Sequence, residues 1–101
     1  MKILSFGEII WDVYPHKSHI GGAPLNFAAH ASKQGAESYL ISAVGDDTLG
    51  EAALSELDKF RINREYVSVK SGKTTGKCTV LLDVNGTPSF SLDNKSAYDE
   101  I

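Results

Sequence analysis

The sequence predicts an α/β fold with a parallel sheet, because strand-like and helix-like segments alternate over the first sixty residues. Apolar runs at 3–6 and 39–44 are typical of buried strands, and helical spacing follows near Asn26 and again after Thr48. A β-hairpin signal at residues 85–86 then ends the alternation. We expect an incomplete α/β core that carries a hairpin.

The N-terminal residues predict one long strand or two consecutive strands. Gly7 stops the apolar run at 3–6, and the run resumes at 9–14 until Pro15 breaks it. Residues 18–24 contain a Gly-Gly pair and a proline, so they predict a turn that leads into a helix.

The first helix is predicted to begin at Asn26 and to stop at Gly35, since glycine commonly follows a helix C-terminus. Its apolar face is expected to contain Phe27, Ala28 and Ala31.

The second helix is predicted to follow the strand at 39–44. Thr48 and Glu51 have the spacing of a capping box, in which the threonine caps a helical amide and the glutamate reaches back. The stripe that this helix is expected to bury recurs near helical spacing and comprises Leu49, Ala53, Leu57 and Phe60.

The C-terminal third predicts a β-hairpin. Two strands, 77–84 and 87–92, flank Asn85-Gly86, which is the strongest short signal for a two-residue hairpin turn. Pro88 cannot donate a backbone hydrogen bond, so its strand is predicted to lie at a sheet edge.

A two-residue turn also predicts which hairpin residues share a face. It places Leu81 opposite Phe90, with Leu92 on the same face. Val80 and Leu82 would then point to the other face, each opposite a serine. Apolar side chains on both faces are typical of a flap that covers a ligand or clasps a partner.

Charge and cysteine content exclude several classes of protein. Ten basic residues against thirteen acidic ones give a formal charge of −3 with no block of either sign, so we expect neither nucleic acid nor membrane as a partner. Cys78 is the only cysteine, so no intrachain disulfide can form. Glu8 interrupts the first apolar run too early for a signal peptide, and we expect a cytoplasmic protein.

Two polar residues are candidates for ligand binding. Asn26 follows the Gly21-Gly22 pair, where backbone can approach a ligand closely, and its amide can both donate to and accept from sugar hydroxyls. Asp12 ends a strand, where its carboxylate could accept from two vicinal hydroxyls. A loop with a helix-capping Asn and a turn Asp explains the same residues locally.

Several glycine-containing motifs resemble the first signature of the PfkB carbohydrate kinases. They are the segment 21–28 (GGAPLNFA), Gly35, the segment 45–47 (GDD) and Gly50, in colinear order. The strand residues Glu8, Trp11 and Asp12 are similar to those of bacterial fructokinases. Thr75-Gly76 followed by an Asn-Gly hairpin resembles the lid of the same group.

The resemblance implies a ribokinase-like, Rossmann-type α/β core with a β-hairpin lid, of which residues 1–101 would be the N-terminal fragment. The lid would comprise segments at approximately 9–20 and 74–95. It also implies an ATP-dependent sugar kinase whose catalytic base, ATP site and magnesium-associated residues lie beyond Ile101, and which forms a homodimer through the lid. The resemblance assigns sugar binding to Asp12, Gly21, Gly22, Asn26, Cys78 and Val80.

Two departures from ribokinases favour a hexose such as fructose over ribose. Ala23 stands where ribokinases have a lysine, and Ile10 stands where they have an asparagine. A kinase for another sugar or a nucleoside, a non-catalytic sugar- or nucleoside-binding module, and an interaction piece whose flap clasps a second chain remain alternatives.

Two further patterns are interpreted as unrelated to binding. Residues 72–77 are similar to a phosphate loop, but a hairpin rather than a helix follows them. The spacing of His16, His19 and His30 matches no compact zinc site, so no metal site is predicted.

Overall fold

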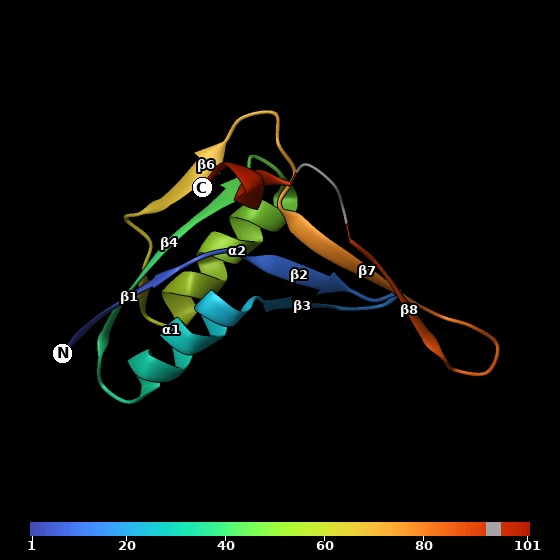
Figure 1. Ribbon diagram of the computed structural model, residues 1–101, viewed down its shortest axis with the longest axis horizontal. Coiled ribbons are helices and arrows are strands. Elements are labelled where there is room, and N and C mark those ends of the chain that lie inside the picture. The colour runs from blue at the N-terminus through green and yellow to red at the C-terminus, as the bar shows by residue number, and fades with distance from the viewer. Residues whose placement is uncertain (93–95) are drawn as a thin grey trace.

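The chain forms two connected sheets, and the structure, a computed structural model, describes residues 1–92 and 96–101 (Figure 1). One sheet is the core sheet, and it consists of β1 (Lys2–Phe6), β4 (Glu37–Gly45), β5 (Ile62–Asn63) and β6 (Val67–Lys70). The other, which we call the lid sheet, has the order β3 (Ser18–Gly21), β2 (Ile10–Val13), β7 (Gly76–Leu82) and β8 (Pro88–Leu92). The remaining elements are the helices α1 (Ala23–Lys33) and α2 (Thr48–Lys59) and the 3₁₀-helix η1 (Ala97–Glu100).

The core sheet is parallel, as predicted, with β4 at its centre. β1 pairs with β4, and β5 and β6 pair with its other edge. α1 connects the lid strand β3 to β4, and α2 connects β4 to β5. The α/β architecture predicted from the alternation of strands and helices is therefore confirmed.

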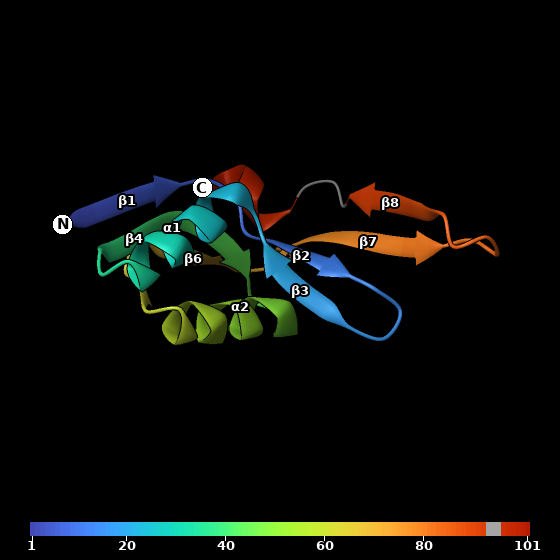
Figure 2. The ribbon, with the colours of Figure 1, turned by 90° about the horizontal axis from the view of Figure 1, so that it is seen from below.

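The two α-helices cover one face of the core sheet. Leu40 and Val44 of β4 are fully buried in one cluster with Leu25 of α1 and Leu57 of α2. The opposite face is open along β1, where Leu4 is exposed, and η1 contacts β4 on that side. Figure 2 shows α2 and η1 on opposite sides of β4, and the lid sheet extends away from both.

The start of α1 differs from the prediction. The helix begins at Ala23, three residues before Asn26, because Gly22 turns the chain with a φ of 109° and proline is well tolerated in the first helical turn. Leu25 therefore takes the core position, while Phe27 is 59% exposed instead of buried. Gly35 ends the helix as predicted, with a φ of 93°.

The N-terminal cap of α2 also differs from the prediction. Asp47, and not Thr48, is the cap residue, and one of its carboxylate oxygens accepts a hydrogen bond from the Gly50 amide at 2.8 Å. A carboxylate accepts from helical amides and also favours the positive end of the helix dipole. The predicted stripe is found: Ala53 and Leu57 are fully buried.

The hairpin has a longer turn than predicted, and its register is shifted by one residue. The amides of Asn85 and Thr87 both donate to the Asp83 carboxylate, at 2.8 and 2.9 Å, and Gly86 has a φ of 78°. These bonds stabilise a three-residue loop, and the glycine supplies the left-handed conformation that such loops require.

The shifted register changes the partners within the hairpin. Val80 lies opposite Phe90 and Cys78 opposite Leu92, so the predicted pairing of Leu81 with Phe90 is wrong. Cys78, Val80, Phe90 and Leu92 therefore share one face. The strand of Pro88 is at the sheet edge, as predicted.

Three short strands, β3, β5 and β6, were not expected from the sequence. β3 occupies the segment predicted as a turn and pairs antiparallel with β2. β3 forms the edge of the lid sheet opposite to β8. The last residues of the predicted lid segment, 93–95, lie outside the described residues.

Candidate functional site

Asp12 lies in a transverse row of side chains on one face of the lid sheet. In the register of the strands it is opposite His19 of β3 on one side and opposite Cys78 of β7 on the other, and Cys78 is opposite Leu92 of β8. Register partners point to the same side of a sheet. The lid face that carries the Asp12 carboxylate thus has an imidazole and a thiol beside it.

The glycine pair lies against the same strand. Gly21 is the register partner of Ile10, and a side chain built at Gly21 would come within 4.0 Å of the Asp12 carboxylate. At Gly22 a β-carbon would lie 2.5 Å from the Glu8 carbonyl oxygen, a distance that no real contact allows. Only glycine fits at Gly22, and the lack of a side chain at Gly21 leaves space beside the Asp12 carboxylate.

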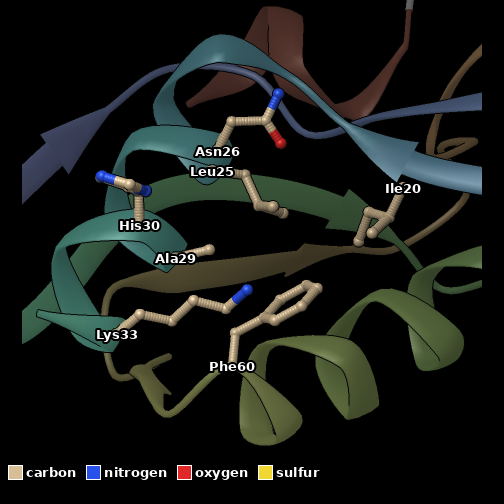
Figure 3. A pocket seen from close by; sticks show the side chains of 7 residues that line it. All are labelled: Ile20, Leu25, Asn26, Ala29, His30, Lys33 and Phe60. Atoms are coloured by element: carbon tan, nitrogen blue, oxygen red, sulfur yellow. The ribbon is translucent and has the colours of Figure 1, made fainter.

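Asn26 lies in the first turn of α1, directly after the glycine pair. Its backbone amide donates to the Gly22 carbonyl at 3.0 Å, and its side chain is exposed. In Figure 3 the carboxamide points away from Lys33 and from Phe60, the residue that follows α2. The side-chain carboxamide of Asn26 is therefore available to a ligand at the junction between α1 and the lid sheet.

A cavity of about 240 Å³ lies between the two helices and β3 (Figure 3). Its apolar wall includes Ile20, which is the register partner of Trp11 and so lies on the lid face opposite to Asp12. The cavity and the Asp12 row are therefore separate features. Its lining residues are Ile20, Leu25, Asn26, Ala29, His30, Lys33 and Phe60.

The two predicted lid contacts differ in what they can present to a ligand. Cys78 is half-buried and stands next to Asp12 in the row. Val80 is two residues further along the same face but is only 2% exposed. The lid face near Asp12 therefore presents the thiol, while Val80 contributes packing.

A hydrogen-bond network that no sequence motif predicts holds Thr75, the residue immediately before β7. The Thr75 hydroxyl donates to Oδ1 of Asp47 at 2.6 Å, the Thr75 amide donates to Oδ2 at 2.9 Å, and the Gly45 amide donates to Thr75 Oγ1 at 2.9 Å. Thr75 is fully buried. No local motif connects Thr75 to Gly45 and Asp47, because Thr75 is far from both in the sequence.

The network shifts the titration of its carboxylate. Partial burial raises the pKa of Asp47, but hydrogen bonds from the Thr75 hydroxyl and amide and from the Gly50 amide outweigh burial. The net pKa of Asp47 therefore lies below its ordinary value. Asp47 is thus a charged anchor at the start of α2.

The other lid strand is attached to the same turn of α2. The indole N–H of Trp11 donates to the Leu49 carbonyl oxygen at 3.1 Å, and Trp11 is buried. Both β2 and β7 are therefore fixed to the first turn of one helix.

The arrangement suits recognition of a polyhydroxylated ligand. A carboxylate accepts from two hydroxyls, a carboxamide accepts and donates, and glycine backbone leaves room for close approach. Among the described residues no group of three or more His, Cys, Asp or Glu side chains could hold a metal ion. In the same residues neither α-helix, of 11 and 12 residues, approaches the length of about 20 that spans a bilayer.

The parallel core sheet with its projecting lid sheet is shared with a solved structure of a sugar kinase from Pyrococcus horikoshii, which is 34% identical. A sequence profile described as pfkB family carbohydrate kinase matches residues 3–100. The chain belongs to this family.

Individual relatives agree with this membership. A protein of Pyrococcus horikoshii described as a sugar kinase is 39% identical over 87 residues, which cover 86% of this chain and 28% of the relative. Fructosamine kinase of Bacillus subtilis is 32% identical over 97 residues, which cover 94% of this chain and 34% of the relative. The chain spans about a third of the length of these curated relatives.

Solved structures show the same fold. The P. horikoshii sugar kinase in complex with ATP superposes with a TM-score of 0.83 at 34% identity, over 95% of this chain and 35% of that one. The fructokinase of Vibrio cholerae in its apo form gives a TM-score of 0.88 at 23% identity, over 97% of this chain and 35% of that one. The predicted ribokinase-like fold is confirmed by these superpositions.

Proposed function

We propose that this chain is the sugar-binding N-terminal part of an ATP-dependent carbohydrate kinase, and that the full-length enzyme phosphorylates a hydroxyl of fructose or a similar hexose. The observation that carries the proposal is the position of Asp12, on an open lid face beside the glycine pair and close to the start of α1. Family membership supplies the reaction class, which is phosphoryl transfer from ATP to a sugar alcohol.

The sugar-binding roles follow the chemistry of the residues. Asp12 accepts hydrogen bonds from two sugar hydroxyls. The Asn26 carboxamide donates one hydrogen bond to a third hydroxyl and accepts one from it. The backbone of Gly21 and Gly22 lets the sugar ring approach β2 closely. Cys78 contacts the sugar from β7, and Val80 supports it.

Fructose is the proposed acceptor for two reasons: Ile10 and Ala23 differ from the residues of ribokinases, and several relatives are named for fructose. One is the fructokinase of Klebsiella pneumoniae, which is 28% identical over 103 residues. Other relatives are named for ribose and fructosamine. The choice of sugar therefore needs a direct comparison of acceptors.

ATP and magnesium are proposed to bind mainly to residues beyond Ile101. Within the described part of the chain, the glycine- and lysine-containing segment 72–77 leads into β7 rather than into a helix, so it lacks the geometry of a phosphate loop. The described residues also offer no cluster of metal ligands, and no step of the reaction is assigned to them.

The full-length enzyme is proposed to be a cytoplasmic homodimer that associates through the lid. Support comes from the exposed apolar side chains of the hairpin, where Phe90 is 69% and Leu92 is 54% exposed on one face. Apolar surface of this kind commonly marks an interface.

The proposal is tested with the full-length enzyme, obtained by reading the gene beyond codon 101. Purified enzyme and MgATP are offered fructose, ribose, glucose and fructosamine in turn, and ADP release is followed. We expect fructose to give the highest kcat/KM, and we expect the 101-residue chain alone to release no ADP. A full-length protein that binds sugar without turnover would support a binding module instead.

A further inference from the structure

The lid carries its sugar-binding groups on two strands that come from distant parts of the chain. Asp12 is on β2 and Cys78 is on β7, and the two are register partners in a parallel pair. A slip of β7 by one residue would turn Cys78 to the opposite face, because side chains alternate along a strand. The proposed site therefore needs a device that fixes the register of β7.

We propose that Thr75 is a positioning residue for sugar binding, which fixes β7 against β2 through its hydrogen bonds to Asp47. The inference rests on the proposed function and names a residue that makes no contact with sugar. Thr75 immediately precedes β7, and Gly76, the first residue of that strand, is the register partner of Ile10. Asp12 follows two residues later on β2, opposite Cys78.

The network uses both the hydroxyl and the backbone amide of Thr75. Its hydroxyl donates to Asp47 and accepts from the Gly45 amide, and its own amide donates to the second carboxylate oxygen of Asp47. Asp47 in turn caps α2 through Gly50. Thr75, immediately before β7, is thus hydrogen-bonded both to the last residue of β4 and to the residue that caps α2.

The residues around the start of β7 are closely packed against their neighbours. A β-carbon at Gly45 would collide with the backbone of Lys73, and one at Gly76 would lie 2.6 Å from the Tyr98 ring and 2.8 Å from the Ile9 carbonyl oxygen. Gly45 therefore lets the backbone of residues 73–75 pass close to the end of β4, and Gly76 lets the first residue of β7 pass close to Tyr98 and Ile9.

Both lid strands share this attachment point. Trp11, the neighbour of Asp12 on β2, donates to the Leu49 carbonyl in the first turn of α2, and Thr75 bonds to the residue that caps the same helix. The spacing between Asp12 and Cys78 is therefore set by two anchors on one rigid element.

The test compares matched variants of the full-length enzyme. Thr75→Val has nearly the same shape but lacks the hydroxyl, so it removes two side-chain hydrogen bonds and leaves the Gly45 amide without its acceptor. Thr75→Ser keeps the hydroxyl. Thr74→Val makes the same change at the exposed neighbouring position. The readouts are KM for fructose, KM for ATP and hydrogen exchange in β7 and α1.

We expect Thr75→Val to raise KM for fructose about tenfold, with KM for ATP within about twofold of wild type. Exchange should increase in β7 and stay unchanged in α1. Thr75→Ser should recover most of the fructose affinity, and Thr74→Val should match wild type. If Thr75→Val does not fold, Asp47→Asn decides, because asparagine also caps helices but cannot accept from both Thr75 donors.

Three outcomes overturn the inference: a folded Thr75→Val or Asp47→Asn enzyme with wild-type KM for fructose, an equal rise in KM for both substrates, or a Thr75→Ser enzyme as impaired as Thr75→Val. A wild-type enzyme that phosphorylates no sugar would instead refute the proposed function. The two failures are therefore distinguishable.

Discussion

Asp12 of β2 and Cys78 of β7 are register partners across the parallel strand pair at the centre of the lid sheet. Their side chains share one face although the two residues are far apart in the sequence. Neither strand could form this face alone, so the candidate site depends on how the lid is assembled.

In the full-length enzyme, Asp12→Asn should reduce kcat/KM for the sugar by roughly thirty- to a thousandfold, which corresponds to about 2 to 4 kcal/mol. The amide makes weaker bonds than the carboxylate and places a donor where two acceptors were available. Initial rates at varied sugar and varied ATP measure the effect, and KM for ATP should barely change.

Asp58→Asn is the matched control, since Asp58 is an exposed residue of α2 whose contact with Arg64 at 3.5 Å is a surface ion pair of small energetic value. If Asp12→Asn lowered the melting temperature steeply while the folded enzyme kept its sugar kinetics, Asp12 would be a structural residue of β2.

Asn26→Ala should raise KM for the sugar by a smaller factor, about three- to tenfold. It removes a neutral partner from an exposed position where water can replace the lost hydrogen bonds. The same kinetic assay applies, with His30→Ala, one turn further along α1, as the control. If Asn26→Ala left KM for the sugar unchanged, the Asn26 carboxamide would not bind the sugar.

The stability of the fold should depend on the charge of Asp47 in acid. Its folded pKa lies below the ordinary value of 3.8, so the unfolded state binds protons first as the pH falls. The stabilisation is complete above the ordinary value and is lost as the pH falls through the lower folded pKa.

Melting temperatures of wild type and Asp47→Asn between pH 2 and pH 6 measure this contribution. The gap between the two proteins should be largest near pH 6 and should close toward pH 2. Parallel curves over the whole range would contradict the assignment of the shift to Asp47.

The 101-residue chain should associate through the apolar face of its hairpin. Sedimentation at several concentrations should show self-association, and Phe90→Ser should weaken it because Phe90 is largely exposed there. Phe27→Ser, an equally drastic change at an exposed position on α1, should leave it unchanged. A wild-type chain that stays monomeric at all concentrations would argue against a lid interface.

The regular elements of the fold were predictable where apolar periodicity was long. β4, α2 and β7 each span seven or more residues, and β8, which has five, was predicted from the turn signal beside it. β3 was missed because its sequence, Ser-His-Ile-Gly, has no alternation and becomes a strand only through pairing with β2. β5, with two residues, is too short for any periodicity.

Side-chain acceptors explain where the local predictions were wrong. Asp83 accepts from two amides across the turn and lengthens the loop that Asn85-Gly86 alone would have closed in two residues. Asp47 likewise takes the cap position that the Thr48 pattern predicted. In both places an aspartate carboxylate accepts backbone amides that the neighbouring motif was expected to arrange differently. A sequence pattern does not show which of the two arrangements is more stable.

The candidate site was only partly predictable for a similar reason. Asp12, Asn26 and the glycine pair stand out in the sequence through a resemblance to a family. His19 lies beside Asp12 because β3 pairs with β2. Thr75, immediately before β7, lies beside Asp47 because the fold brings two distant segments together. No spacing along the chain indicates His19, and the resemblance of Thr75-Gly76 to the lid of fructokinases does not indicate that Thr75 bonds to Asp47.

The indole of Trp11 gives this chain an optical reporter of its own. It is the only tryptophan among the 101 residues, it is buried, and its N–H is bonded to the carbonyl of Leu49 in α2. Any movement that separates β2 from that helix would break this bond and expose the ring to water. The emission colour of one native fluorophore therefore registers whether the lid is attached, without a dye, a label or a substitution.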